Sequence, residues 1–396
     1  MKRIFLRVGL AFLAAALLSG CQTLMTQVKA HRAMQEGRYE ASVALFLEVL
    51  NKDVNHVEAL KGLGETYLRM KKEPEAEKVL EKVHRLSPND KVATINLGLA
   101  YSMNGKYDKA IQIWRPVVEK EPNSNLSAVL RRQITLASYR DAAKQAKEAV
   151  RHEAAVQSAP GEPNTLAITY FGDKGLPEQA KPLRKAFAAM LITDLSKTKS
   201  LKVVERIRLQ TLLDELHLGT SGLVDDRTAP RVGRLLGAGK IVTGNMLVAG
   251  GDKIDVISLL TNVPTGGEAG KQEANGLLKE FFKIEKAIAF GVIRDMGVRL
   301  AKEEEETIGR YATQSYPGLL YYGEGLDAQD RGEWDKAVAV FQKCLKEDPT
   351  GPCAAALLEA PSGNDAEASA SVTALLSSLA TAAAADASSG DGNGDG

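Results

Sequence analysis

LKVVERIRLQTLLDELHL (Leu201–Leu218), followed after a turn by VGRLLGAGKIVTGNMLV (Val232–Val248), decides the fold of the central part of this chain. The run Leu201–Arg206 contains adjacent valines and predicts a strand. Apolar residues then recur at helical spacing and predict a helix with one apolar face: Leu209, Leu212, Leu213 and Leu216. A second short helix is expected to end at Gly237, and Ile241–Val248 predicts another strand.

The flanking segments complete a small α+β domain. A strand is expected over Thr165–Phe171, and the next helix has an apolar stripe made by Leu183, Phe187, Leu191 and Leu195. The turn Ala249–Asp252 predicts a hairpin between the Ile241–Val248 strand and a further strand, Lys253–Val263. A long helix closes the domain, with Leu277, Phe281, Ile284, Ile288 and Val292 on its apolar face. The order β-α-β-α-α-β-β-α predicts helices packed against a small sheet.

These segments carry residues that resemble the CsgG family of outer-membrane lipoproteins, best known for curli secretion. The resemblance covers roughly residues 164–301, within a domain expected over 164–303. The residues that carry it are Glu205, Arg206, Leu209, Leu213, Gly237, Ala238 and Gly244, together with Gly251–Ile254 and Asn262–Gly266. It implies an α+β domain that works in secretion, with a homo-oligomer through this domain as a further expectation. The adjacent charges of Glu205 and Arg206 themselves favour an ion pair with neighbouring residues.

The resemblance also raises the question of a pore, because the family's secretion channels insert long amphipathic hairpins between the strands of this domain. Here the turn between Val248 and Lys253 has only four residues, whereas a membrane strand needs about 9 to 11. The second position, Glu268–Leu277, is glycine-rich, charged and too short for a hairpin. A pore-forming curli-type channel is therefore disfavoured.

The N-terminus predicts a bacterial lipoprotein. Residues 1–20 contain a basic start and a short apolar run, which is typical of a signal peptide. Leu18–Cys21 (LSGC) resembles a lipobox, which implies cleavage before Cys21 and acylation, including palmitate, of its thiol. Because Gln22 is not aspartate, the family's sorting rule implies the periplasmic side of the outer membrane. The alternative is an ordinary secretory peptide in which Cys21 is coincidental.

Residues 21–124 repeat with a period of 34 and resemble three tetratricopeptide repeats. The pairs Gly64 and Gly98, Tyr67 and Tyr101, Ala76 and Ala110, and Pro88 and Pro122 are each 34 residues apart. Small residues at such positions allow two helices to cross closely, and proline ends the second helix of a unit. Arrays of this type form a groove that binds peptides or helices. The alternative is a spacer that only separates the next domain from the membrane.

The remaining segments are assigned by pattern. Residues 125–157 predict a helix that caps the array, and residues 158–163 contain two prolines and a glycine that indicate a linker. A lone repeat is expected over 318–351, marked by Gly325, Ala337 and Pro349, and it must dock on another surface. The Ala/Ser/Gly/Asp tail, 361–396, predicts disorder with a transient helix over Val372–Leu379.

Two cysteines remain if Cys21 is acylated, and an oxidising compartment favours pairing them. Cys344 ends the second helix of the lone repeat and Cys353 begins the next apolar segment, so their Cα atoms could come within roughly 4.4–6.8 Å. They either form a disulfide or pack as two small hydrophobic residues.

No pattern indicates catalysis. The five histidines are scattered without metal-ligand spacing, so no metal and no cofactor are expected. Gly237–Lys240 lacks the first glycine and the final serine or threonine of a phosphate-binding loop. The 51 basic residues nearly balance 50 acidic ones, which excludes nucleic-acid recruitment by net charge.

The sequence therefore predicts a non-enzymatic, outer-membrane-anchored periplasmic lipoprotein. Its expected role is a protein-binding scaffold or accessory in curli-like secretion or cell-envelope assembly, with envelope or secretion proteins bound in the repeat groove. An activator lipoprotein for cell-wall synthesis is the competing hypothesis, because a small α+β domain on an acyl tether suits both roles.

Overall fold

The computed structural model describes residues 22–156, 161–218, 224–225, 227–370 and 372–390. The expected signal peptide and Cys21 lie outside the described residues. The chain forms two units, which we call the repeat unit (Met1–Ala137 with Glu367–Gly396) and the sheet unit (Ser138–Ala366). The predicted combination of a helical repeat array with an α+β domain is confirmed.

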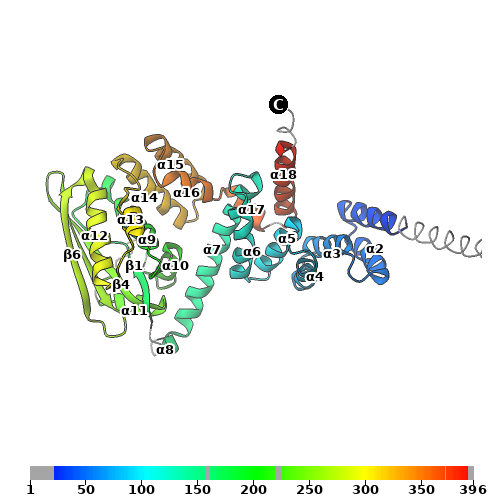
Figure 1. Cartoon of the computed structure of the whole chain (residues 1–396), viewed down its shortest axis with the longest axis horizontal. Coiled ribbons are helices and arrows are strands. Elements are labelled where there is room, and N and C mark those ends of the chain that lie inside the picture. Colours follow the sequence, from blue (N-terminus) through cyan, green and yellow to red (C-terminus); the bar gives the residue numbers. More distant parts are fainter. Residues whose placement is uncertain (1–21, 157–160, 219–223, 226, 371, 391–396) are drawn as a thin grey trace, which may run out of the picture. The chain divides into compact units, whose positions relative to one another are not determined.

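The described part of the repeat unit consists of helices and their connections. A helix over residues 22–35 precedes five helices, each of which packs against the next (Figure 1): α2 (Tyr39–Lys52), α3 (Val57–Arg69), α4 (Glu73–Leu86), α5 (Lys91–Met103) and α6 (Tyr107–Lys120). A Cβ on Gly64 would overlap Leu80, and one on Gly98 would overlap the Trp114 indole. The Trp114 Nε1 donates a hydrogen bond to the Ile95 carbonyl oxygen at 3.1 Å. The 34-residue period therefore encodes close crossings between the two helices of each repeat.

Helix α7 (Asn125–Arg151) corrects the expected solvating cap. Its residues up to Ala137 belong to the repeat unit and those from Ser138 to the sheet unit, and α8 (Glu153–Val156) follows after a break. Ala142 is buried, and Ala146 belongs to the main hydrophobic core of the sheet unit. Because alanine allows a helix to approach closely, the second half of α7 packs into that unit instead of facing solvent.

The expected disorder of the tail is wrong for residues 363–370 and 372–390. These residues form α17 (Gly363–Ala370) and α18 (Val372–Gly390). Alanine has the highest helix propensity, so an Ala-rich segment needs only a modest apolar stripe to order it. That stripe is Leu375, Leu376, Leu379 and Ala382, all at most 8% exposed. The glycine- and aspartate-rich end of the tail, 391–396, lies outside the described residues.

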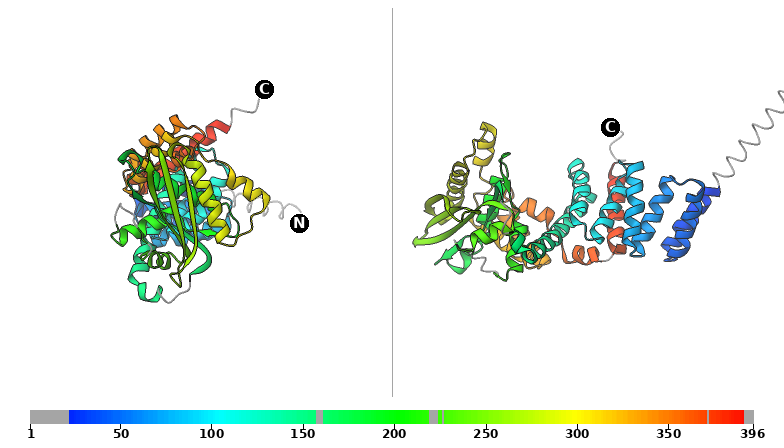
Figure 2. Two further views of the ribbon diagram at one scale, coloured as in Figure 1. Left: turned by 90° about the vertical axis from the view of Figure 1, so that its left-hand side faces the viewer. Right: turned by 90° about the horizontal axis from the view of Figure 1, so that it is seen from below.

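The sheet unit is built on one six-stranded sheet (Figure 2, left). Its strands are β1 (Glu162–Ile168), β2 (Gly172–Lys174), β3 (Lys202–Val203), β4 (Ala238–Gly250), β5 (Lys253–Asn262) and β6 (Glu268–Leu277). The order is β3-β1-β4-β5-β6, and β2 also pairs with β4. β1 is parallel to both β3 and β4, whereas β4, β5 and β6 form an antiparallel meander in which Gly244 pairs with Ser258.

Several strand expectations need correction. No strand was predicted over Glu268–Leu277, but nine residues of β6 pair with β5, and Gln272 is buried within it. A strand of six residues was expected over Leu201–Arg206, but β3 has only two, and α10 already begins at Arg206. β1 begins at Glu162, so the end of the expected linker is strand, and β2 was not foreseen. A polar strand at the sheet edge lacks the hydrophobic alternation that signals strands in sequence.

The helices of the sheet unit pack against this sheet and against one another. They are α9 (Leu183–Leu195), α10 (Arg206–Glu215), α11 (Ala229–Leu235), α12 (Phe281–Asp295), α13 (Lys302–Gly309), α14 (Tyr316–Asp330), α15 (Trp334–Glu347) and α16 (Cys353–Glu359). Helices α9 and α12 pack together through Phe187 and Phe281, whose ring centroids are 5.0 Å apart. Leu277, expected on the closing helix, is instead the last residue of β6. The lone repeat, α14 and α15, docks on α9.

Candidate functional site

The repeat unit contains an apolar face that holds a helix. Ile95 and Leu99 of α5, with Leu126 and Val129 of α7, are at most 7% exposed. They belong to one hydrophobic cluster with the Leu375, Leu376, Leu379 and Ala382 stripe of α18, and α18 also contacts α3. We call these four residues of α5 and α7 the helix-binding face. The chain's own last helix therefore lies against the repeat helices, beside α5 in Figure 1, where a groove for a partner was expected.

A carboxylate fixes one end of α18. Asp386 Oδ1 accepts hydrogen bonds from the Asn125 backbone N–H at 2.8 Å and from the Asn125 side-chain amide at 3.0 Å. Its Oδ2 accepts one from the Leu126 N–H at 3.0 Å. Desolvation opposes ionisation of Asp386, but the hydrogen bonds from Leu126 and Asn125 lower its pKa overall. The carboxylate thus satisfies free N–H groups at the positive end of α7.

The helix-binding face continues beyond α18. Val92 lies about one turn before Ile95 on α5. Val92, Ile95 and Leu99 follow an i, i+3, i+7 spacing and so lie on one side of that helix. It is 49% exposed, so this end of the stripe is open to solvent. A shallow cleft between α7 and α18 is lined by Asn125, Ala128, Val129, Arg132, Ala374, Ser377, Ser378, Thr381, Ala382 and Ala385.

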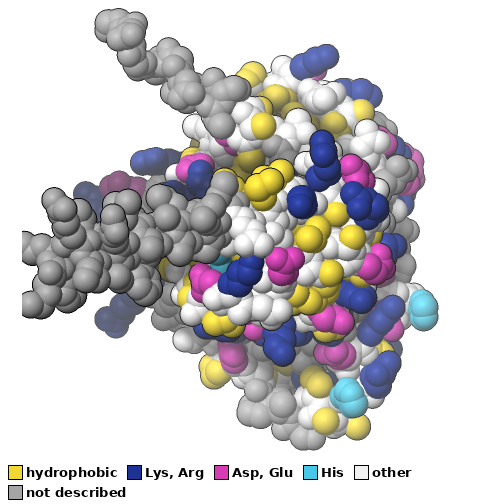
Figure 3. Space-filling model, turned by 90° about the vertical axis from the view of Figure 1, so that its right-hand side faces the viewer, with side chains coloured by type: hydrophobic (Ala, Val, Ile, Leu, Met, Phe, Trp, Pro, Cys, Tyr) yellow, Lys and Arg dark blue, Asp and Glu magenta, His cyan; other side chains and the backbone are white. Residues whose placement is uncertain are grey.

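The first described helix also exposes apolar residues. Leu24, Met25 and Val28 are 61%, 58% and 61% exposed, and Leu24 and Val28 are four residues apart on one side of the helix. On the side of the molecule shown in Figure 3, hydrophobic side chains are interspersed with lysine, arginine, aspartate and glutamate. The apolar group at residues 24–28 begins three residues after Cys21.

The sheet unit contains a buried charge cluster around Asp330, the last residue of α14. Arg206 Nη1 lies 2.6 Å from Asp330 Oδ2, and Lys185 Nζ lies 2.8 Å from the same oxygen. The Asp330 side chain is only 2% exposed, whereas those of Arg206 and Lys185 are 10% and 11% exposed. Lys185 also pairs with Asp327 at 2.8 Å. One turn of α14 therefore neutralises two cations, one from α9 and one from α10.

Tyrosines close the charge cluster. The Tyr139 hydroxyl of α7 donates to Asp330 Oδ1 at 2.9 Å, and its ring makes an edge-on contact with Trp334. Burial is the main cause of the raised pKa of Tyr139 and of Tyr170, which lies 3.5 Å from Arg206 Nη1 through its hydroxyl oxygen. Both tyrosines therefore stay neutral and act as hydrogen-bonding groups.

A cavity of about 340 Å³ opens beside this cluster. Its lining mixes charges of both signs: Lys181, Arg184, Lys185 and Arg331 with Glu178, Glu324 and Asp327. Arg184 is bonded to the Phe171 carbonyl oxygen and Asp173, and Arg331 to Asp327 and Glu333. The arrangement binds structural elements to one another and offers no nucleophile beside a base. In the described part of the chain, no group of three or more His, Cys, Asp or Glu residues is placed to hold a metal ion.

Three family models match parts of the chain. The model of the curli production assembly/transport component CsgG matches residues 135–250. The model of the Psidin N-terminal tetratricopeptide region matches residues 29–164, and a tetratricopeptide repeat model matches 318–351. The chain combines a CsgG-like domain with tetratricopeptide repeats. The CsgG match begins within α7 and ends with β4, so it leaves out β5, β6 and α12.

Solved structures resemble the chain only distantly. The first tetratricopeptide domain of Spaghetti (RPAP3), bound to an HSP90 peptide, is 22% identical over 26% of this chain and 80% of that chain, with a TM-score of 0.25. The C-terminal domain of LpoB from Salmonella enterica is 12% identical over 34% of this chain and 94% of that chain, with a TM-score of 0.24. With TM-scores this low, neither bears on function. No curated protein matches the chain.

Most motif residues of the CsgG-like domain have packing roles. Leu209 and Leu213 are in its core, and Ala238 is fully buried at the start of β4. Gly237 has a φ of +71° between α11 and β4, a conformation that favours glycine. A Cβ on Gly244 would overlap Phe171. Glu205 directly precedes α10 and makes no side-chain cap hydrogen bond there, so Arg206 is the motif residue whose charge joins the buried cluster.

The other members of the charge cluster were missed in the sequence. Tyr139 and Asp330, which bond to Arg206, and Lys185, which bonds to Asp330, come from α7, α14 and α9, three segments that no shared motif relates. Lys185 lies two residues from both Leu183 and Phe187 and so falls off their apolar stripe. No local pattern in the sequence therefore indicates that Lys185 is buried or which residue it pairs with.

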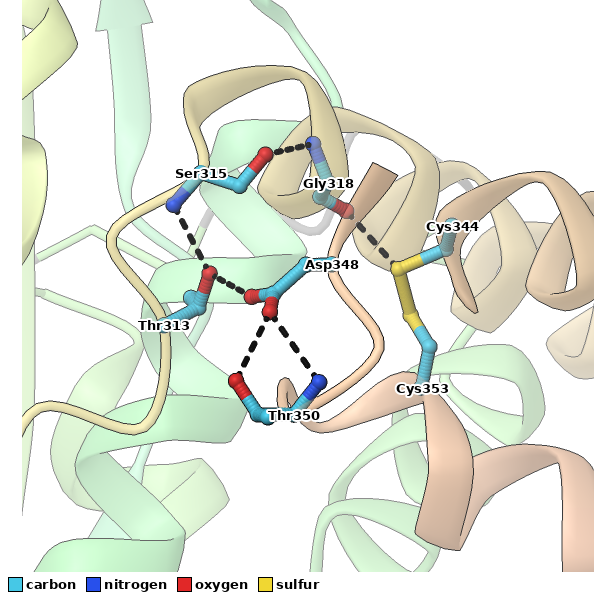
Figure 4. The surroundings of a disulfide bond; sticks show 7 residues. All are labelled: Thr313, Ser315, Gly318, Cys344, Asp348, Thr350 and Cys353. Atoms are coloured by element: carbon cyan, nitrogen blue, oxygen red, sulfur yellow. Dashed lines mark hydrogen bonds between the residues drawn. A yellow bond between two sulfur atoms is a disulfide. The ribbon is translucent and has the colours of Figure 1, made fainter. Parts of the chain in front are cut away.

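A disulfide joins Cys344 of α15 to Cys353 of α16, with their Cα atoms 5.9 Å apart (Figure 4). Beside it, Asp348 accepts hydrogen bonds from Thr313 and from the Thr350 backbone and hydroxyl. Ser315 caps α14 by accepting from the Gly318 N–H at 3.1 Å. The bond and the Asp348 network together fix the turn that ends the C-terminal repeat.

Removing the disulfide with Cys344→Ala and Cys353→Ala is expected to lower the free energy of unfolding by about 2–3 kcal/mol, because the bond closes a short loop in the unfolded chain. Urea denaturation of both proteins without reductant measures the difference. The wild type with reductant is the control and should match the double variant. Equal midpoints for all three would show that packing alone holds this repeat.

Proposed function

We propose that this chain is an outer-membrane-anchored periplasmic lipoprotein that works as a non-enzymatic protein-binding scaffold in curli-like secretion or cell-envelope assembly. The observation that carries the proposal is the helix-binding face, where α5 and α7 bury the apolar stripe of a helix. The family matches support it, since repeats of this type and a CsgG-like domain occur here in one chain.

The helix-binding face supports recognition of a partner helix. Leu375, Leu376 and Leu379 lie at helical spacing, so the face already fits an i, i+1, i+4 pattern of leucines. Val92 extends the same stripe and is 49% exposed, which leaves apolar surface open to a partner. Apolar side chains at the centre of such a surface provide most of the binding free energy.

The membrane anchor rests on the lipobox and on the residues beside it. Each acyl CH₂ that enters the bilayer contributes about 0.8 kcal/mol, and exposed Leu24, Met25 and Val28 would add apolar contact next to Cys21. Among the described residues, no helix is long and apolar enough to cross a bilayer.

Cys21→Ser is expected to abolish acylation and move the protein from the membrane fraction to the soluble periplasmic fraction. Labelled palmitate and sucrose-gradient fractionation measure the two effects. Gln22→Asp is the matched control: it should keep the label and shift the protein to the inner membrane. Equal labelling of wild type and Cys21→Ser would contradict the anchor.

The scaffold itself is tested by cross-linking in living cells. A photo-reactive residue at Val92 should capture a specific envelope protein, because this position continues the helix-binding face into solvent. Val129→Glu in the same chain should abolish capture, whereas Lys343→Glu, an exposed change on α15, should leave it intact. Capture that is unaffected by Val129→Glu would remove the face from the function.

A further inference from the structure

We propose that α18 is a displaceable intramolecular ligand of the repeat array, and that the external partner of the helix-binding face is an amphipathic helix of the same chemistry. That chemistry is an Ala/Leu helix with leucines at i, i+1 and i+4 and a carboxylate near its C-terminal end. The inference rests on the proposed function, in which this face binds a protein partner.

The first argument concerns how little holds α18 in place. Its described buried residues are three leucines and one alanine, and Asp386 is the only ionisable residue between Val372 and Gly390. Ordering 19 residues costs conformational entropy that so small a stripe only partly offsets. The contact is therefore weak by itself and persists because α18 is attached to the chain.

The second argument concerns polarity and specificity. The Asp386 carboxylate accepts from two successive backbone N–H groups and one side chain at the start of α7. An anion at a helix N-terminus is favoured by the helix dipole. A hydrocarbon stripe alone would accept a helix in either direction, whereas this anchor places the C-terminal part of the bound helix at Asn125. A partner must therefore carry a carboxylate at the matching position, seven residues beyond the last leucine of the stripe.

The third argument concerns competition. A tethered ligand acts at an effective concentration on the order of millimolar, so a weak α18 contact still occupies most molecules. An external helix then binds with its affinity reduced by the fraction of chains in which the face is free. Release of α18 removes this penalty, which makes the array binding-competent only when a better helix or a higher local concentration is present.

The test uses a fluorescent peptide with the sequence of residues 372–390 and the full-length chain. In the released variant, Leu376→Glu/Leu379→Glu, the peptide should bind at least about tenfold tighter than to wild type. Ala383→Glu/Ala384→Glu adds the same number of charges to α18 at positions outside the stripe and outside the cleft, and should bind like wild type. A peptide carrying Asp386→Asn should bind the released variant about fivefold more weakly.

Hydrogen exchange supplies a second reading. Amides of residues 372–390 should be protected in wild type and exchange rapidly in the released variant, while α4 and α6 remain protected. If the released variant fails to fold, Asp386→Asn in the full chain replaces it, with an expected gain of about fivefold in peptide affinity.

The outcomes separate this inference from the proposed function. Equal peptide affinity for wild type and released chains would overturn self-occupation while leaving the face as a helix-binding site. No peptide binding to either chain, with cross-linking at Val92 retained, would overturn the partner chemistry but not the scaffold. If the cross-link at Val92 is lost but the peptide still binds the released chain, the scaffold function alone would be overturned.

Discussion

Replacing Asp330 by asparagine is expected to lower the free energy of unfolding of the sheet unit by about 3–5 kcal/mol. The amide keeps the shape of the carboxylate but removes its charge. Arg206 and Lys185 then remain beside it, at most 11% exposed, with Asp327 as the only carboxylate still bonded to Lys185. Removing one member of a buried ion cluster is costly because the remaining charge has lost its water and gained no partner.

The matched control replaces both members of the pair. Arg206→Met/Asp330→Leu removes the charges together and should recover most of the lost stability, because apolar residues of similar volume often substitute well for a buried ion pair. Hydrogen exchange under increasing urea resolves the two units, with α14 and α15 as reporters and α3 and α4 as an internal reference. A loss below about 1 kcal/mol in Asp330→Asn would mean that water reaches the cluster.

The repeat array could be predicted because its period fixes its packing. The glycine pair spaced by 34 marks two places where only a small residue fits, Gly64 against Leu80 and Gly98 against Trp114. The α+β class followed from the leucine stripe of α10 and from the hairpin between β4 and β5, both of which are local patterns. The family matches and the fold confirm these two predictions.

The segments that were mispredicted owe their structure to distant contacts. β6 is polar, and it is a strand because β5 offers a free edge and α12 covers it. α18 is ordered because its stripe meets α5 and α7 more than 200 residues away in sequence, as the Asn125–Asp386 hydrogen bond shows with a separation of 261. Amino-acid composition carries no information about such a distant contact, so an Ala/Ser-rich tail is predicted to be disordered.

The candidate sites divide in the same way. An ion pair for Arg206 was foreseen, but its partner on the C-terminal repeat follows only from the docking of α14 on α9. The groove was foreseen from the repeats, whereas its occupation by α18 was not. Local periodicity thus predicts surfaces, and only the tertiary structure shows which surfaces meet.

A second buried carboxylate should make the stability of the sheet unit depend on pH. Glu285 of α12 is fully buried beside Asp194 of α9. Lys286 and Lys197 both pair with Asp194, and Lys286 also lies 3.5 Å from Glu285 Oε2. Burial, followed by repulsion from Asp194, raises the pKa of Glu285 from 4.5 to about 8. The folded protein therefore keeps the Glu285 carboxyl protonated at neutral pH, while the unfolded chain does not.

The sign of the effect follows from proton uptake. Between pH 4.5 and 8 the folded state binds one more proton at Glu285 than the unfolded state, so the free energy of unfolding falls as pH rises through this range. The stabilisation is complete below the unfolded pKa and is lost above about pH 8, with a total on the order of 3–5 kcal/mol.

Glu285→Gln is expected to remove this dependence, because the amide is a neutral isostere of the protonated carboxyl. At about pH 9 the variant should be more stable than wild type by a similar 3–5 kcal/mol, and at about pH 5 the two should agree within about 1 kcal/mol. Glu305→Gln, an exposed change on α13, is the control and should follow wild type throughout. Urea denaturation at both pH values gives the differences, and other titrating groups cancel between proteins compared at one pH. A stability difference between wild type and Glu285→Gln that stays the same from pH 5 to pH 9 would mean that Glu285 is ionised in the folded protein. Lys286 would then form a stronger ion pair with Glu285 than with Asp194.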